Sequence, residues 1–172
     1  MARRKKKGTH RRLIVSVQQR GGSQDHHEAI EQHVHDILAV LCGARLANTF
    51  RITVKLRVTT LGTDYGRAHW RDRSRSATAR SKHHTITVKR DLPIQQQLSV
   101  VTHELKHIVQ MAKGRLAFRR DAYYWRPVGH VGPSVRYDRT SCYWHRPWEV
   151  EARKAESDYR HIARRHSAAF AK

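Results

Sequence analysis

Cysteine, acidic residues and long apolar runs are all scarce in this chain of 172 residues. Its two cysteines, Cys42 and Cys142, lie far apart, which excludes a disulfide framework and a cysteine-type zinc site and predicts two buried free thiols. No run of roughly eighteen apolar residues exists, so no transmembrane helix is expected. The apolar stretch Leu13-Ile14-Val15 near the N-terminus is too short for a secretory signal. We therefore expect an intracellular protein, in the cytoplasm or associated with the nucleoid or nucleus, or one packaged in a virus particle.

The shortage of acids leaves a strong excess of positive charge. Lys and Arg number 35 against 14 Asp and Glu, which gives a formal net charge of +21. This balance predicts a polyanionic partner, first of all nucleic acid bound through its phosphates. The alternative is a charged surface that only keeps the protein soluble. An anionic membrane is not expected, because no segment sets a Lys/Arg face against a Trp/Phe/Leu face. Residues 1–12, predicted to be a disordered basic arm, and residues 71–90 are the candidates for phosphate contact.

The pattern of apolar residues predicts an α+β fold, with a single domain over residues 13–172. Alternation of apolar and polar residues predicts strands at residues 13–17, 50–58, 67–70 and 84–89. Helical spacing predicts helices at residues 23–42, 94–113 and 147–170. The expected end signals are Ser23 as N-cap, Gly43 and Gly114 as helix stops, and Pro147 at a first helical position.

Two further segments and one group of histidines carry weaker patterns. Residues 71–82 are predicted to form an exposed basic loop, and residues 118–144 an irregular aromatic stretch. The first helix also carries His26, His27, His33 and His35. No face of that helix combines them with carboxylates, so we expect them to be solvated rather than to bind a second metal.

The segment His103-Glu104-Leu105-Lys106-His107 is an HExxH motif inside the second predicted helix. Two histidines four residues apart share one helix face and can bind one zinc ion. Glu104 lies beside them, where it can take a proton from a water activated by the metal. Lys106 occupies a position that is usually uncharged in such motifs, and its side chain is expected to point to solvent. The motif predicts a hydrolytic metal site.

A catalytic zinc site needs a third protein ligand, with water in the fourth place. A carboxylate one turn into the last helix can reach the metal, and both Glu149 and Glu151 qualify. His130 and His145 are the histidine alternatives. The acid that does not bind the metal is expected to stabilise the helix dipole.

Residues 50–165 resemble the small zincin metallopeptidases of the gluzincin type. This resemblance implies a minimal zincin fold: a small mixed sheet packed on the HExxH helix, and a later helix that supplies a Glu ligand. In those families the Glu often begins an E-x-x-A-D/N pattern, which Glu149 and Ala152 fit, whereas Arg153 occupies the Asp/Asn place. The missing acid leaves the orientation of one ligand histidine unexplained. The apolar face of the last helix, formed by Ala152, Ala155, Tyr159 and Ile162, lies closer to Glu151 and favours that residue instead. Glu149 is the preferred candidate, and Glu151 stays open as the alternative.

A second resemblance is to SprT-like (Spartan-type) proteases, which act on proteins bound to DNA. Residues 66–70, 85–88 and 101–104 are similar to the core of that family. It usually uses a third histidine, a role that His130 or His145 would fill here.

These patterns together predict a zinc metallopeptidase that hydrolyses a protein or peptide and associates with nucleic acid. Glu104 is the expected general base. Candidates to stabilise the oxyanion are Tyr137, Tyr143 and His145, and residues 67–70 are a candidate edge strand for pairing with an extended substrate. The rings and cations of residues 118–126 and 143–148 either stack on unpaired bases or line the core and the pocket. The alternative function is a basic nucleic-acid-binding or packaging protein whose zincin fold is not catalytic.

Overall fold

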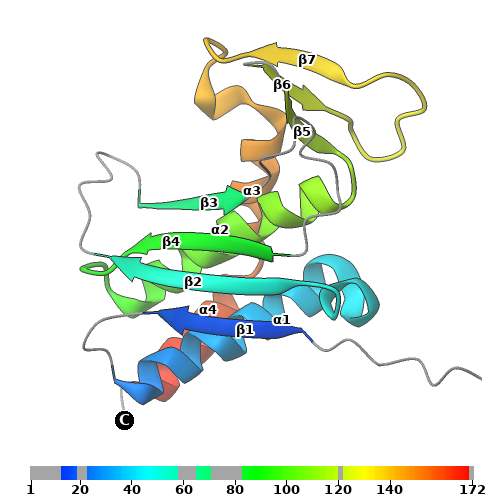
Figure 1. Ribbon diagram of the computed structural model, residues 1–172. Coiled ribbons are helices and arrows are strands. Elements are labelled where there is room, and N and C mark those ends of the chain that lie inside the picture. The colour runs from blue at the N-terminus through cyan, green and yellow to red at the C-terminus, as the bar shows by residue number, and fades with distance from the viewer. Residues whose placement is uncertain (1–12, 19–22, 58–64, 71–82, 120–121, 171–172) are drawn as a thin grey trace, which may run out of the picture.

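A computed structural model describes residues 13–18, 23–57, 65–70, 83–119 and 122–170. The fold is of mixed α+β type, as predicted, with four helices and two separate sheets in the described part of the chain (Figure 1). The predicted basic arm at residues 1–12 and basic loop at residues 71–82 lie outside the described residues. Among the described residues, no helix combines the length and the apolar character that a membrane span requires.

The main sheet has four strands in the order β1-β2-β4-β3. These are β1 (Ile14–Gln18), β2 (Arg51–Arg57), β3 (Gly66–Trp70) and β4 (His83–Lys89). β1, β2 and β4 are parallel, and β3 runs antiparallel to β4 at the edge of the described sheet. Parallel neighbours need a crossover connection, which α1 supplies between β1 and β2. All four predicted strands are therefore confirmed.

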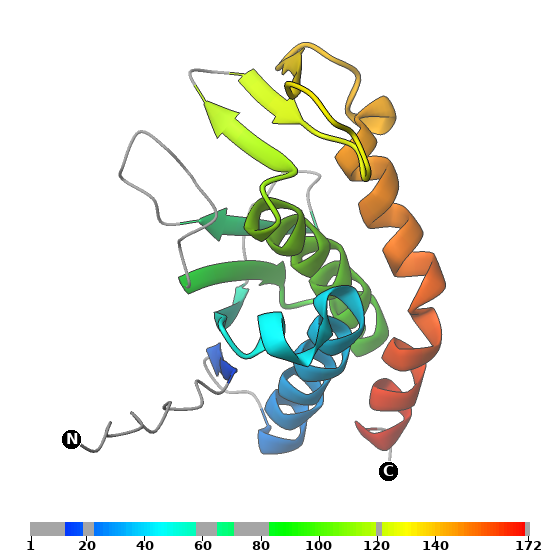
Figure 2. The same ribbon diagram turned by 90° about the vertical axis from the view of Figure 1, so that its right-hand side faces the viewer.

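The helices form two layers on one side of this sheet (Figure 2). α1 (Gln24–Ala47) and α2 (Ile94–Ala112) contact the strands, and α3 (Pro147–Asp158) and α4 (Arg160–Phe170) pack on the far side of α1 and α2. α2 is therefore covered by the sheet on one side and by α3 and α4 on the other. This middle position explains why α2 buries polar as well as apolar side chains.

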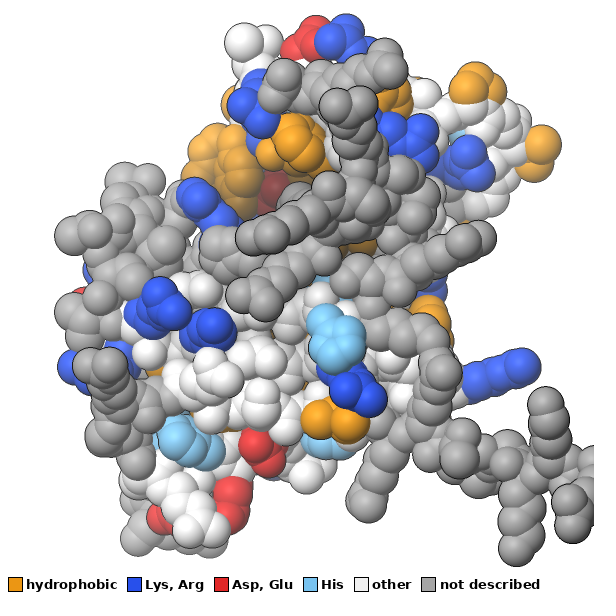
Figure 3. All heavy atoms as spheres, viewed as in Figure 1, with side chains coloured by type: hydrophobic (Ala, Val, Ile, Leu, Met, Phe, Trp, Pro, Cys, Tyr) orange, Lys and Arg blue, Asp and Glu red, His pale blue; other side chains and the backbone are white. Residues whose placement is uncertain are grey.

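The core lies between the main sheet and the first helical layer. Alternate residues of β2 and β4 point into it, as the sequence alternation predicts. The buried residues are Ile52, Val54, Leu56, Ile86 and Val88 from the strands, Ile30, Val34, Ile37 and Leu38 from α1, and Leu98, Val101, Leu105, Ile108 and Val109 from α2. The opposite face of the sheet carries no helix among the described residues, and Figure 3 shows Lys, Arg and His side chains on it.

Residues 118–144 contain regular strands, which corrects the prediction of an irregular stretch. β5 (Leu116–Arg119), β6 (Ala122–Trp125) and β7 (Val135–Asp138) form an antiparallel sheet of three strands, followed by the 3-10 helix η1 (Tyr143–His145). Rings from this sheet pack against the buried indole of Trp148 at the start of α3, with the Tyr123 and Tyr137 ring centroids 5.0 and 5.2 Å from it. The strands are short, and their apolar face is aromatic rather than a simple alternation, so the period-2 signal is weak.

Two predicted helices have different bounds. α1 extends to Ala47, but Gly43, with φ of +75° and ψ of 153°, is not helical and divides it into two helical segments at a kink, so the first segment ends at the predicted position. The predicted final helix is divided at Tyr159 into α3 and α4. The predicted end signals at Ser23 and Gly114 are confirmed: the Ser23 hydroxyl accepts from the amide of His26, and Gly114 has φ of +66°.

Three burial predictions were wrong. Cys142 is exposed and Cys42 is only half-buried, so neither is a fully buried thiol. His33 is fully buried instead of solvated, and its Nε2 lies 2.8 Å from the Thr102 hydroxyl of α2. α4 packs over that part of α1, and the sequence of α1 alone cannot reveal this cover.

Candidate metal centre

α2 brings the two motif histidines to the surface that it shares with α3. His103 and His107 are one helical turn apart, and their Nε2 atoms lie 3.1 Å from each other. Their rings meet edge to face. Both side chains are largely buried, because α3 crosses the outer side of α2 at this level.

Glu149 in the first turn of α3 completes a cluster of three side chains. Its Oε2 lies 3.1 Å from Nε2 of His103 and 3.3 Å from Nε2 of His107. Ligand atoms about 2.0–2.1 Å from a tetrahedral ion lie about 3.3 Å apart, so these spacings fit one ion of that size. Two imidazoles and one carboxylate are also a common ligand set of catalytic zinc. In the described part of the chain, this is the group of His, Cys, Asp and Glu side chains that could hold a metal ion.

The outer nitrogens of both imidazoles have their own hydrogen-bond acceptors. His103 Nδ1 lies 2.5 Å from Oε1 of Glu156, and His107 Nδ1 lies 3.0 Å from Oε1 of Gln110. The amide nitrogen of Gln110 donates to the Trp148 carbonyl, which leaves its oxygen to accept from His107. Each Nε2 is thereby left free to act as an electron-pair donor towards the centre of the cluster.

Glu156 was not predicted as a functional residue. It lies seven residues after Glu149, two helical turns further along α3, so both carboxylates face α2. The Ser99 hydroxyl donates to its second oxygen at 3.1 Å. Arg153 occupies the place where the family pattern has an Asp or Asn, and Glu156 supplies an acid three residues later instead. A search of the sequence for acids four and seven residues after Glu149 would have found Glu156.

The other candidate ligands lie away from the cluster. Glu151 accepts two hydrogen bonds from the Arg115 guanidinium, at 3.1 and 2.5 Å, and lies 3.4 Å from Nζ of Lys106. The ion pair with Glu151 also explains how the motif accommodates the charge of Lys106. His130, in the loop after β6, and His145, in η1, are both exposed and do not join the cluster.

The electrostatics of the cluster favour a positive charge at its centre. Burial opposes ionisation of Glu149, but the hydrogen bonds with His103 and His107 outweigh it and hold the pKa of this carboxyl below its usual range. Burial lowers the pKa of His103, yet its contacts with Glu149 and Glu156 prevail and raise that pKa to about 9. Both shifts show that the cluster stabilises a positive charge beside Glu149.

Glu104 lies on the opposite side of the histidines, towards the main sheet. Its Oε2 accepts from the backbone amide of Ala68 in β3 at 2.6 Å. Burial raises the pKa of the Glu104 carboxyl, although His107 and His103 act in the opposite direction. The hydrogen bond from Ala68 thus fixes the Glu104 carboxylate relative to β3.

Gly66 allows this close approach of β3 to α2. A Cβ at Gly66 would lie 2.2 Å from Cγ1 of Val100, on the second turn of α2, and 3.3 Å from the Thr87 carbonyl. Only a residue without a side chain fits between the strand and the helix here.

Of the three candidate oxyanion donors, Tyr143 lies nearest the cluster. Burial and the neighbouring Glu149 carboxylate raise the pKa of its hydroxyl. The Tyr137 ring packs on Trp148, and the Arg146 guanidinium lies 5.2 and 5.7 Å from the rings of Tyr123 and Tyr143. Most of these aromatic side chains therefore support the start of α3.

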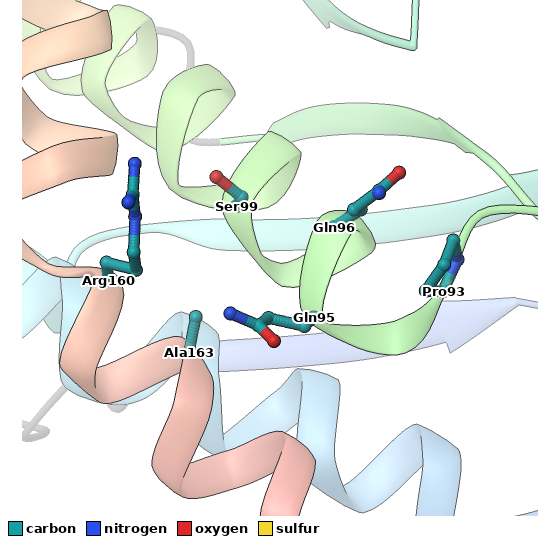
Figure 4. Close-up of a pocket in the computed structure, with 6 residues that line it drawn as sticks. All are labelled: Pro93, Gln95, Gln96, Ser99, Arg160 and Ala163. Atoms are coloured by element: carbon teal, nitrogen blue, oxygen red, sulfur yellow. The ribbon is translucent and has the colours of Figure 1, made fainter.

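A separate pocket of about 320 Å³ opens between the start of α2 and α4 (Figure 4). It is lined by Pro93, Gln95, Gln96, Ser99, Arg160 and Ala163. None of these residues belongs to the cluster, and the connection between the two is the hydrogen bond from Ser99 to Glu156. This pocket is therefore separate from the candidate metal site.

Comparisons of the chain with protein-family models, with curated proteins and with solved structures found no match.

Proposed function

We propose that this protein is a zinc-dependent metallopeptidase of zincin type. The observation that carries the proposal is the convergence of three ligand atoms, from His103, His107 and Glu149, at separations of 3.1 to 3.3 Å. A zinc ion held there would polarise the scissile carbonyl and lower the pKa of a water molecule. His103, His107 and Glu149 would hold the ion and would leave one of its positions for that water, as hydrolysis requires.

Glu104 is the general base of the proposed reaction. Its carboxylate takes the proton of the attacking water and later gives it to the leaving amine. Burial raises its pKa towards the working pH, which suits both transfers. Tyr143 is the preferred donor to the oxyanion, because its hydroxyl interacts with the proposed ligand Glu149.

The substrate is an extended segment of protein or peptide. β3 is the edge of the main sheet in the described residues, and it lies against α2 beside Glu104. An extended segment can add to that edge through main-chain hydrogen bonds and so bring a peptide bond to the metal centre.

We further propose that the protein associates with nucleic acid. The net charge of +21 supports this, and so do the Lys and Arg side chains on the open face of the main sheet (Figure 3). Binding to DNA or RNA should weaken steeply as salt rises, because phosphate contacts release counterions. An affinity that changes little between 50 and 200 mM salt would remove this part of the proposal.

Metal analysis and a proteolysis assay together test the enzymatic function. Wild-type protein should hold one zinc per chain and cleave an unfolded protein substrate. Glu104→Gln should retain the zinc and lose at least about 100-fold in rate, since general-base catalysis contributes about 10²–10⁴-fold. If the purified chain holds no zinc and Glu104→Gln changes nothing, the non-catalytic nucleic-acid-binding alternative is the better description.

A further inference from the structure

The charges of this protein are segregated between the main sheet and the helices behind it. The sequences of β1, β2, β3 and β4 contain no Asp or Glu. By contrast, α1 carries four of the chain's 14 acids, α2 carries one and α3 carries four. The strands of the main sheet therefore contribute positive charge without any negative charge of their own.

β2 directs three cations to the face of the sheet that points away from the helices. Arg51, Lys55 and Arg57 alternate with the buried residues of this strand, and successive side chains of a strand point to opposite faces. Arg51 and Arg57 are exposed, and Lys55 is partly exposed. Six steps of about 3.3 Å separate Arg51 from Arg57, so the row is about 20 Å long.

The strand register extends this row across the sheet. Lys55 pairs with Thr87 of β4, which pairs in turn with Arg67 of β3, and Arg57 pairs with Lys89 of β4. Neighbouring strands lie about 4.8 Å apart, so the backbones at Lys55 and Arg67 are about 10 Å apart. Figure 3 views this side of the molecule and shows Lys and Arg side chains on it. We call this surface the basic face, formed by Arg51, Lys55, Arg57, Arg67 and Lys89.

Hydroxyl groups, and not aromatic rings, lie between these cations. Thr53 of β2 pairs with Thr85 of β4, and the Ser16 hydroxyl of β1 donates to the Thr53 hydroxyl at 3.2 Å. In the described strands of the main sheet, no outward position holds Phe, Tyr or Trp. Proteins that bind single strands stack bases on such rings, whereas Arg, Lys, Ser and Thr donate to phosphate oxygens. The composition of the basic face therefore fits phosphates better than unstacked bases.

We infer that the basic face binds the phosphate backbone of double-stranded DNA, without regard to base sequence. The row along β2 is as long as about six nucleotide steps of a duplex, at about 3.4 Å per step. This inference rests on the proposed association with nucleic acid, because it names the surface and the form of the partner.

The basic face and the metal centre lie on opposite sides of the main sheet. Arg67 is on the basic face, and the next residue of β3, Ala68, donates to Glu104 of α2. A duplex on the basic face therefore does not cover α2, which carries the two motif histidines. DNA binding and the chemistry at the metal centre can accordingly be tested independently.

Fluorescence anisotropy with the full-length protein and a labelled DNA duplex tests the inference. The triple variant Arg51→Gln/Lys55→Gln/Arg57→Gln is preferred because Lys89 already pairs with Asp91 at 3.6 Å. It should bind the duplex about tenfold or more weakly than wild type, because it loses three phosphate contacts. The plot of log affinity against log salt concentration should become shallower by about 2–3, since each contact contributes about 0.9.

A matched control removes the same three charges from the outer helical layer. Lys154, Arg160 and Arg164 are exposed on α3 and α4. The variant Lys154→Gln/Arg160→Gln/Arg164→Gln should keep the duplex affinity within about threefold of wild type and keep the salt dependence, because these positions make no phosphate contact. Equal losses of affinity in the two triple variants would overturn the inference, because total charge rather than the basic face would then govern binding.

Single charge reversals keep the test decisive if the triple variant does not fold. Lys55→Glu should weaken duplex binding at least about fivefold more than Arg164→Glu, because it places a negative charge among the phosphate contacts. Urea unfolding of each variant shows whether a loss of binding is a loss of fold. Equal effects of the two reversals, in variants that are as stable as wild type, would also overturn the inference.

Two competitors decide what the basic face binds. If wild type prefers the single strand of the same sequence to the duplex, or if polyglutamate displaces the labelled duplex as readily as unlabelled duplex does, the assignment to double-stranded DNA is wrong. A wild-type protein that binds no DNA would also remove the proposed association with nucleic acid, whereas binding that does not depend on the basic face would overturn this inference alone. Cleavage of a peptide in the absence of DNA is measured separately and reports on the proposed peptidase.

Discussion

The Nδ1 atom of His103 lies 2.5 Å from Oε1 of Glu156, which joins the middle of α2 to the last turn of α3. This contact fixes the ring of one metal-ligand candidate from outside the cluster. It also favours one tautomer, because Nδ1–H donates a hydrogen bond to the Glu156 carboxylate and the lone pair of Nε2 is left for the metal. The Ser99 hydroxyl holds the second oxygen of Glu156, so the orienting group is itself oriented.

Loss of this carboxylate should weaken metal binding without removing a ligand. We predict that Glu156→Ala lowers zinc affinity about 10–100-fold, the range for such outer partners of ligand histidines. Competition with a chromophoric chelator measures the change. Asp158→Ala is the control on the same helix, because Asp158 is exposed and pairs with Lys154. The zinc affinity of this variant should stay within about twofold of wild type. Equal affinities for Glu156→Ala and Asp158→Ala would contradict the role of Glu156.

Glu149 and Glu151 should differ sharply in their effects, although they are two residues apart. Glu149→Ala removes a proposed ligand, so we predict a loss of zinc affinity larger than the roughly 100-fold upper range for outer partners. Glu151→Ala should keep zinc and instead lower the free energy of unfolding by roughly 1–3 kcal/mol, because Arg115 loses its charged hydrogen-bond acceptor. Zinc stoichiometry and urea unfolding of both variants distinguish the roles. Retention of zinc by Glu149→Ala together with its loss in Glu151→Ala would reverse the assignment.

The parts of this fold that follow a regular period were predictable from sequence. The strands of the main sheet and the apolar face of α2 repeat at 2 and 3.6 residues, and the HExxH spacing alone places two histidines on one face. The small aromatic sheet was missed because Tyr123 and Trp125 pack on Trp148, a residue far along the chain. The role of Glu156 and the burial of His33 likewise depend on which helices pack against each other. The spacing of apolar residues within one helix does not predict that packing.

The space between β3 and α2 should be sensitive to a single methyl group. In Gly66→Ala the new Cβ would meet Cγ1 of Val100, whose branched side chain has one preferred rotamer in a helix. We predict that the strand moves away from the helix, which costs about 1–3 kcal/mol of unfolding free energy and weakens the hydrogen bond from Ala68 to Glu104. Proteolytic rate and urea unfolding measure both effects.

A second substitution makes this test specific. Val100→Ala opens the space that the new methyl group needs, so the double variant Gly66→Ala/Val100→Ala should recover much of the stability lost in Gly66→Ala. Strictly additive losses in the two variants would show that the clash at Val100 is not the cause.

His33 should make the protein less stable as the pH falls below about 6.5. Burial lowers its pKa from the ordinary 6.5 to about 3, and the charges of His166 and Arg165 add to this, whereas Asp36 opposes it. The Thr102 hydroxyl donates to the Leu98 carbonyl and accepts from Nε2 of His33, while Nδ1 is buried without a partner in the described residues. The Leu98 carbonyl favours a second proton on the folded ring, but burial and the charge of His166 outweigh it.

Because the folded pKa lies below the unfolded one, the unfolded chain binds one more proton between about pH 6.5 and 3. The free energy of unfolding should fall across this window with a slope that approaches about 1.4 kcal/mol per pH unit from this residue, and the contribution of the residue to the slope should fade to almost nothing by about pH 8. Urea unfolding of wild type and His33→Gln at pH 7, 6, 5 and 4 isolates the effect, since glutamine does not titrate and its amide can still donate to Thr102. The difference in slope between the two proteins should approach one proton. Parallel curves from pH 7 to 4 would show that His33 ionises as easily in the folded chain as in the unfolded one.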